Sequence, residues 1–201
     1  MPDLDALNRD PTLDALEQQL VRDNPPTQRT YVGGSVIGQD CEKALWYSFR
    51  WALENVFDAV TLARFADGHA SEAIVAKRLQ AIPGLRLWTE AEDGNQYGYS
   101  DLGGHLRMHL DGVIKGLVQA PKTPHVWEHK CVNERKFRSL EKKKVEHGEK
   151  NALEHWDTTY FGQAQMYMGQ SGIKRHYLTV ATPGSRELTS SRTEFQPAVY
   201  K

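Results

Sequence analysis

The 201-residue sequence predicts an α/β fold in which one central mixed β-sheet is flanked by α-helices. The length fits one domain large enough to bury a hydrophobic core. Apolar residues recur at helical spacing in the first eighty residues, whereas the middle third alternates between apolar and polar residues. Later segments repeat both patterns, so the predicted order is three helices, three strands, two helices and two strands.

The first 30 residues are predicted to be an N-terminal helical extension and linker, and residues 31–201 the domain proper. A short helix is expected from about Thr12, ending before Pro25 and Pro26, because proline disfavours helix in the residue before it. Residues 1–20 carry five acids against Arg9, a net charge of about −4.

Two further helices are predicted before the sheet. The first covers residues 39–54, with five core positions: Cys41, Leu45, Trp46, Phe49 and Ala52. The second covers residues 61–82 and ends at Pro83 and Gly84. Its expected core face consists of four residues: Phe65, Ala73, Ile74 and Leu79.

Strands and helices then share the rest of the chain. A strand is predicted at 85–92, and glycine-interrupted paired strands at 94–117. The remaining predicted elements are a strand at 125–132, helices at 133–148 and 154–172, and strands at 176–182 and 187–195.

Composition excludes several classes of protein. No apolar run approaches the roughly 20 residues of a membrane span, and the acidic N-terminus lacks the features of a signal peptide. We therefore expect a cytoplasmic protein without a membrane partner. The two cysteines, Cys41 and Cys131, are expected to be reduced thiols and are too few for an iron–sulfur cluster.

The most informative segment runs from Gly103 to Val132. Alternation in its first half places Leu106, Met108 and Leu110 on one strand face. The opposite face receives His105, Arg107, His109 and Asp111. In the next strand Glu128 and Lys130 point to one side with Val126, whereas Trp127, His129 and Cys131 point to the other.

Asp111, Glu128 and Lys130 together suggest phosphodiester hydrolysis. Two carboxylates on adjacent strands can bind a hard divalent cation, which lowers the pKa of a water and neutralises phosphodiester oxygens. Lys130 beside them can orient the attacking water. The alternative is a solvent-facing strand edge with a surface ion pair.

Three further motifs occur in the same chain, two before Asp111 and one after Lys130. Residues 31–52 contain Ser35, one cysteine, Lys43 and an aromatic pair; Glu72 follows Gly68 by four positions on a predicted helix. Gln163 and Tyr167 form a Gln-x-x-x-Tyr motif one helical turn apart. Over residues 35–172 the chain resembles the PD-(D/E)XK nuclease superfamily, in its RecB-like and lambda-exonuclease-like branch of phage-type exonucleases.

The resemblance implies a restriction-endonuclease-like core and a role for each motif residue. Asp111, Glu128 and the carbonyl of His129 would hold one or two Mg²⁺ or Mn²⁺ ions. Glu72 would join them from its helix, with neighbouring His69 as an open alternative.

Three further residues receive roles from the resemblance. Lys130 would position the attacking water, and Gln163 and Tyr167 would brace the site and touch the DNA end.

The activity implied is metal-dependent exonucleolytic hydrolysis of DNA in recombination or phage genome processing, with a recombination or single-strand-annealing protein as partner. Two alternatives remain open: an endonuclease or junction resolvase, and a non-catalytic nucleic-acid-binding module with the same fold.

Basic residues gather after the second site strand, where residues 130–150 carry a net charge of about +4. The predicted nucleic-acid-binding residues are Arg107, Arg135, Lys136, Arg138, Lys142, Lys143 and Lys144. The alternative for the segment is a solvated helix with internal ion pairs. Trp46 and Trp127 are expected to pack in the core, the alternative being stacking on single-stranded DNA.

Overall fold

A computed structural model describes residues 10–50, 52 and 54–200 and contains a five-stranded mixed sheet at its centre. The strand order is β2 (Arg86–Trp88), β5 (Gly112–Lys115), β6 (His125–Cys131), β7 (Arg175–Ala181) and β8 (Leu188–Glu194). β6 and β7 pair in parallel and the other neighbours are antiparallel. The predicted central mixed sheet is therefore confirmed.

A second, three-stranded sheet was not predicted. Its order is β1 (Val32–Gly33), β4 (Leu106–His109) and β3 (Gly98–Asp101), with β1 parallel and β3 antiparallel to β4. β1 has only two residues, which is too short for any alternation to show in the sequence.

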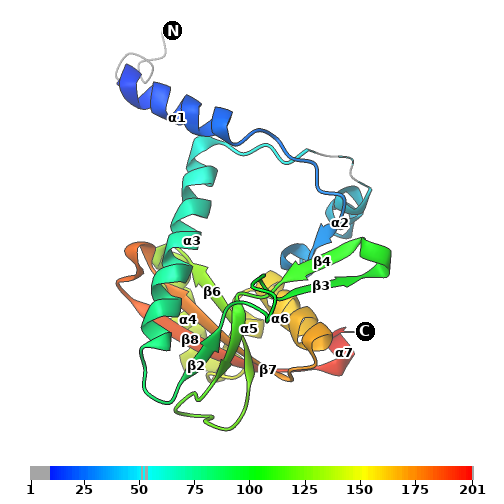
Figure 1. Ribbon diagram of the computed structural model, residues 1–201, viewed down its shortest axis with the longest axis vertical. Coiled ribbons are helices and arrows are strands. Elements are labelled where there is room, and N and C mark those ends of the chain that lie inside the picture. Colours follow the sequence, from blue (N-terminus) through cyan, green and yellow to red (C-terminus); the bar gives the residue numbers. More distant parts are fainter. Residues whose placement is uncertain (1–9, 51, 53, 201) are drawn as a thin grey trace.

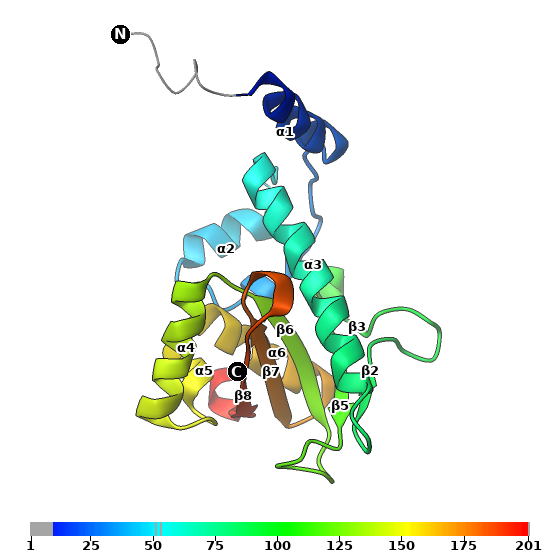
Figure 2. The same ribbon diagram turned by 90° about the vertical axis from the view of Figure 1, so that its left-hand side faces the viewer.

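Helices cover both faces of the large sheet (Figures 1 and 2). α3 (Ala59–Gln80) lies on one face, where Val75 packs with Leu87, Ile114 and Trp127. The other face is covered by three helices: α4 (Glu134–His147), α5 (Ala152–Trp156) and α6 (Thr158–Ser171). A short α7 (Pro197–Tyr200) follows β8.

The N-terminal helix lies outside both layers. α1 (Pro11–Asp23) starts at the N-cap Asp10, has no buried residue, and meets the N-terminal end of α3 (Figure 1). The predicted division at residue 30 precedes β1 closely, but it stays a prediction, and residues 1–9 lie outside the described part of the chain. In that described part, no helix combines the length and apolar character needed to cross a membrane.

The core face predicted for α3 is wrong in its main residues. Phe65 is 45% and Ile74 40% exposed, Ala73 is exposed, and Leu79 is only half-buried. The helix instead buries Leu62, Ser71, Val75 and Ala76. Sequence reasoning favoured the larger apolar side chains, whereas α3 presents mainly small ones to β6.

Two other expectations need correction. α2 spans Glu42–Phe49, shorter than predicted; residues 51 and 53 lie outside the described part. Trp46 and Phe49 are 55% and 40% exposed and Cys41 is exposed, so these predicted core positions are wrong, whereas Trp127 is fully buried as predicted.

The predicted helix at 154–172 is two helices that meet at Asp157. This residue is extended, and its carboxylate accepts a hydrogen bond from the Tyr160 backbone N–H at 2.9 Å, so it begins α6 as an N-cap. Gly172 ends α6 in the left-handed conformation, as the sequence suggested.

The segment after β1 packs closely on α6 through glycines. A Cβ added to Gly38 would lie 2.6 Å from the Thr158 carbonyl oxygen, and one added to Gly162 would lie 2.7 Å from the Gly38 Cα. Only glycine allows the two backbones to approach this closely.

Candidate active site

Strand alternation places Asp111 beside β6, as the sequence predicted. Leu106, Met108 and Leu110 are buried, and Asp111 follows them between β4 and β5. The Asp111 Oδ2 accepts a hydrogen bond of 2.8 Å from the backbone N–H of His129. This bond fixes the carboxylate next to the strand that carries the Glu-x-Lys pair.

Glu128 and Lys130 lie on one face of β6, toward α6. Glu128 is 3% exposed, and the Lys130 ammonium donates a short hydrogen bond to its Oε1. The ring centroid of Tyr160 lies 5.2 Å from the same ammonium. The two residues thus form a nearly buried ion pair, unlike the solvent-exposed pair of the alternative interpretation.

α6 completes this side of the site. The Gln163 Nε2 donates to the Glu128 Oε1 at 2.8 Å and to the Tyr167 hydroxyl at 2.9 Å. Gln163 and Tyr167 are both buried, so the motif that the sequence placed on one helical face does contact Glu128.

Glu72 and His69 approach from α3 on the side of Asp111. Both line a pocket of about 380 Å³ together with Asp111, Glu90 and Gln96. Because both α3 side chains share this pocket with Asp111, the choice between them stays open.

The carboxyl groups of the site have raised pKa values because they are buried and lie close to one another. Burial, reinforced by the charge of Asp111, raises the pKa of Glu72 to about 7. Burial also raises the pKa of Glu128, with Asp111 adding to the effect, and burial raises the pKa of Asp111. Although burial alone would lower the pKa of Lys130, the carboxylates of Glu128 and Asp111 outweigh it and raise that pKa. The carboxyl groups therefore keep their protons to a higher pH than free carboxyl groups do, and a bound cation would favour their charged forms.

The donor set fits a hard divalent cation. The buried Glu128 Oε2 has no hydrogen-bond partner, and the carboxylates offer the oxygen ligands that Mg²⁺ prefers. Within the described residues, no three His, Cys, Asp or Glu side chains stand close enough to be a formed metal cluster. In this structure, the positive charge next to the Glu128 carboxylate comes from the Lys130 ammonium.

Behind His129 lies a buried polar network that sequence reasoning missed. The His129 ring forms hydrogen bonds with Ser71 Oγ at 2.8 Å and with Thr179 Oγ1 at 3.0 Å. The Ser71 hydroxyl in turn forms a hydrogen bond of 2.7 Å with Ser185 Oγ. Burial lowers the pKa of His129 to about 4, so the ring is neutral. Since this ring faces α3, away from Glu128, the metal role suggested for His129 involves only its backbone carbonyl.

The predicted DNA-binding cations on α4 are mostly engaged in ion pairs. The pairs are Lys136 with Asp157, Arg138 with Glu187 and Glu134, Lys142 and Lys143 with Glu146, and Lys144 with Glu141. Arg135 is exposed. This arrangement favours the solvated-helix alternative for the second half of α4.

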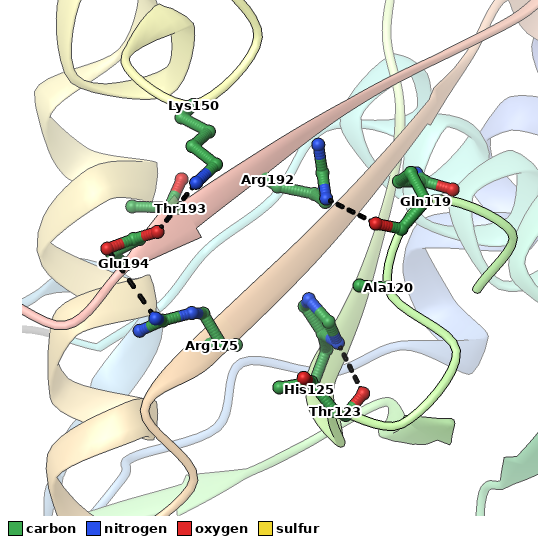
Figure 3. A pocket seen from close by; sticks show the side chains of 9 residues that line it. All are labelled: Gln119, Ala120, Thr123, His125, Lys150, Arg175, Arg192, Thr193 and Glu194. Atoms are coloured by element: carbon green, nitrogen blue, oxygen red, sulfur yellow. Dashed lines mark hydrogen bonds and ion pairs between the residues drawn. The ribbon is translucent and has the colours of Figure 1, made fainter. Parts of the chain in front are cut away.

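A separate pocket of about 270 Å³ lies at the other end of the large sheet, where β6 and β7 begin (Figure 3). The basic side chains that line it already form ion pairs within the protein: Lys150 and Arg175 contact Glu194, and Arg192 pairs with Glu149. This pocket contains none of the predicted site residues.

Comparison with known proteins supports the fold. No protein-family model matches the sequence, and no curated protein matches it. The alkaline exonuclease LHK-Exo from Laribacter hongkongensis is structurally similar, with a TM-score of 0.56 and 15% identity over 90% of this chain and 84% of that one. The same enzyme in complex with dAMP matches with a TM-score of 0.56 and 14% identity over the same shares. This chain has the PD-(D/E)XK nuclease fold.

The resemblance inferred from the sequence is therefore confirmed for the fold. In this PD-(D/E)XK fold the predicted motifs converge from three elements, because α3, β6 and α6 bring Glu72, Lys130 and Gln163 around Asp111 and Glu128. The functional roles of these residues remain proposals.

Proposed function

We propose that this chain is a divalent-metal-dependent deoxyribonuclease that shortens DNA from its ends. One observation carries the nuclease assignment: in a PD-(D/E)XK fold, Lys130 and Gln163 both bind Oε1 of the buried Glu128, whose Oε2 is unpartnered. The preference for DNA ends rests on the Gln-x-x-x-Tyr motif and the lambda-exonuclease-like resemblance. The presence of Asp111, Glu128 and Lys130 together argues against a non-catalytic relative.

The ligands and the chemistry of the metal follow from the donor set. Asp111 and Glu128 would hold Mg²⁺ or Mn²⁺, helped by Glu72 or His69 and by the carbonyl of His129. When bound, the ion makes a water more acidic and neutralises phosphodiester oxygens.

The protein groups around it position the reactants. Lys130 orients the attacking water with its ammonium, which Glu128 fixes in place. The oxygen of this water bonds to phosphorus as one P–O ester bond breaks, the water gives up a proton to solvent, and the leaving oxygen takes up a proton from solvent. Gln163 fixes the Glu128 carboxylate, and Tyr167 fixes Gln163 in turn. Positioning of this kind acts through orientation and preorganised charge.

The deciding experiment compares DNA with and without ends. End-labelled linear DNA and covalently closed circular DNA are incubated with Mg²⁺, Mn²⁺ or EDTA, beside Glu128→Gln as matched control. Linear DNA should lose nucleotides only with metal, and closed circles should survive. Cleavage of closed circles would identify an endonuclease, and no cleavage of linear, circular, single-stranded or branched DNA would leave the non-catalytic binding module.

We further propose a cellular role in recombination or phage genome processing. A metal-dependent exonuclease generates single strands, so a single-strand-annealing protein is the partner class that would use them. Pull-down of a purified annealing protein with the full chain tests this, and no retention at low salt would reject it.

A further inference from the structure

Aromatic side chains, most of them exposed, gather on α2 and directly before β4. Trp46 is 55% and Phe49 40% exposed, although both are large apolar groups. The Trp46 and Tyr47 rings lie 5.3 Å apart, as do the Phe49 and His105 rings. We refer to Trp46, Tyr47, Phe49 and His105 as the aromatic surface.

An apolar pocket of about 240 Å³ borders this surface. Its lining includes Leu45, Trp46, Phe49 and Leu102. Leu102 is 66% exposed and has a φ of 50°, a left-handed conformation that is strained for leucine. Backbone strain that holds an apolar side chain at a pocket rim is typical of a binding site and not of core packing.

Cations at this surface stack on rings. The Lys43 ammonium lies 5.8 Å from the Tyr47 ring centroid, and the Arg50 guanidinium lies 5.8 Å from the Trp46 ring centroid. Arg107 lies 5.1 Å from the Tyr31 ring centroid. In the described part of the chain, none of these three cations forms an ion pair with a carboxylate, in contrast to the lysines of α4.

The aromatic surface is connected to the carboxylates. From His105 the chain runs along β4 to Asp111, which at about 3.3 Å per residue is roughly 20 Å. The segment around the 3₁₀ turn Gly34–Val36 also links the two. Val32 and Ile37 beside the turn line the apolar pocket, and a Cβ added to Gly34 would lie 2.8 Å from the Tyr167 ring. In Figure 1, α2 and β4 lie on one side of the molecule and α3, which carries Glu72, on the other.

We propose that the aromatic surface binds single-stranded DNA, stacking bases on Trp46 and Phe49 while Lys43, Arg50 and Arg107 contact its phosphates. Unpaired bases offer flat apolar faces, and base stacking on aromatic side chains does not depend on sequence. Cations without carboxylate partners can meet phosphates without first breaking an ion pair. An apolar protein helix in the same pocket would leave those cations unneutralised.

The proposal deepens the proposed function, because it supplies a nuclease site with a contact for the strand that leads to it or leaves it. It also differs from the sequence-based expectation for α4, since it moves the main contact with DNA to α2 and β4.

The test measures binding without cleavage. Anisotropy of fluorescein-labelled oligodeoxythymidylate is titrated with full-length protein in EDTA, for wild type, Trp46→Ala and Phe49→Ala. Each variant should bind about tenfold more weakly, the lower part of the range for loss of one stacked base. Trp88→Ala is the matched control, because Trp88 on β2 is 41% exposed and lies outside the aromatic surface. It should bind like the wild type.

Further measurements make the test decisive even if an alanine variant folds poorly. Trp46→Phe, which keeps a flat ring, should retain the affinity. Arg50→Gln should reduce the slope of log affinity against log salt by about 0.7. Wild-type affinity in both alanine variants, an unchanged slope, or an equal loss for blunt duplex DNA would overturn the proposal. Loss of binding in the alanine variants of a protein that cleaves no DNA would support the aromatic surface and reject the nuclease.

Discussion

The side-chain amide of Gln163 donates to the carboxylate of Glu128 at 2.8 Å, joining α6 to β6 across the buried side of the site. Because the same nitrogen also donates to Tyr167 at 2.9 Å, one glutamine holds two functional groups in register. The helix that forms part of the core therefore also sets the orientation of a proposed metal ligand.

Replacing Gln163 should reveal this dual role. Gln163→Leu removes both hydrogen bonds and leaves the Glu128 carboxylate and the Tyr167 hydroxyl without this partner, so the free energy of unfolding should fall by about 1–3 kcal/mol. Single-turnover cleavage should fall with it. Tyr167→Phe, which removes one hydroxyl only, should lose less stability, and urea denaturation compares the two. Equal stability of Gln163→Leu and wild type would contradict the positioning role.

Neutralising Glu128 should separate activity from stability. Glu128→Gln keeps the shape and an oxygen for Lys130 and Gln163, but it removes a charge that burial and Asp111 disfavour. We expect cleavage to fall by orders of magnitude while the melting temperature in EDTA stays equal or rises. Cleavage rates and thermal melts of the same preparation check this. Near-wild-type turnover with Mg²⁺ would exclude Glu128 as a metal ligand.

Lys130 should matter for rate more than for binding. Lys130→Ala is expected to cleave about 10² to 10⁴ times more slowly, the range of positioned acid–base and electrostatic groups. Its affinity for DNA should stay within several-fold of wild type, measured by anisotropy in EDTA. Lys130→Arg should not restore the rate, because guanidinium is larger and planar. A Lys130→Ala protein that cleaves normally would place the catalytic centre elsewhere.

Glu72 should make metal-free stability depend on pH. Its pKa of about 7 lies above the ordinary 4.5, so the folded state binds more protons than the unfolded state between these values. Stability from this group is therefore complete at low pH and is lost as pH rises through about 7. Glu72→Gln should melt near wild type at pH 5 and above it at pH 8 in EDTA. If the difference in melting temperature is the same at both pH values, the raised pKa is refuted.

Removal of the α4 lysines should change little. Lys142, Lys143 and Lys144 each contact Glu141 or Glu146, so their charges are largely balanced within the helix. We expect the triple alanine variant to retain the salt dependence of duplex binding, read as log affinity against log salt. If the slope of log affinity against log salt instead becomes shallower by about 0.9 for each lost contact, these lysines contact phosphates.

The local patterns of the sequence predicted the center of the site well. Strand alternation set Glu128 and Lys130 on one side of β6, and helical spacing set Gln163 and Tyr167 on one face of α6. Both arrangements depend on neighbours within one element, which a single sequence shows directly.

Contacts between distant elements were not predictable in the same way. Ser71 and Thr179 meet at His129, although each is an ordinary polar residue in its own segment. The exposed position of Trp46 depends on what α2 packs against, and a helical repeat cannot distinguish a core face from a face that is kept open.

The paired glycines at 38 and 162 make the site vulnerable at a distance. A single methyl group at either position would push α6 away from the segment after β1, since less than 3 Å separates the added carbon from backbone. Gln163 directly follows Gly162, so such a displacement would move its amide relative to Glu128. A protein with alanine at either position would keep every residue of the site, but its Glu128 carboxylate would no longer be held in the same orientation.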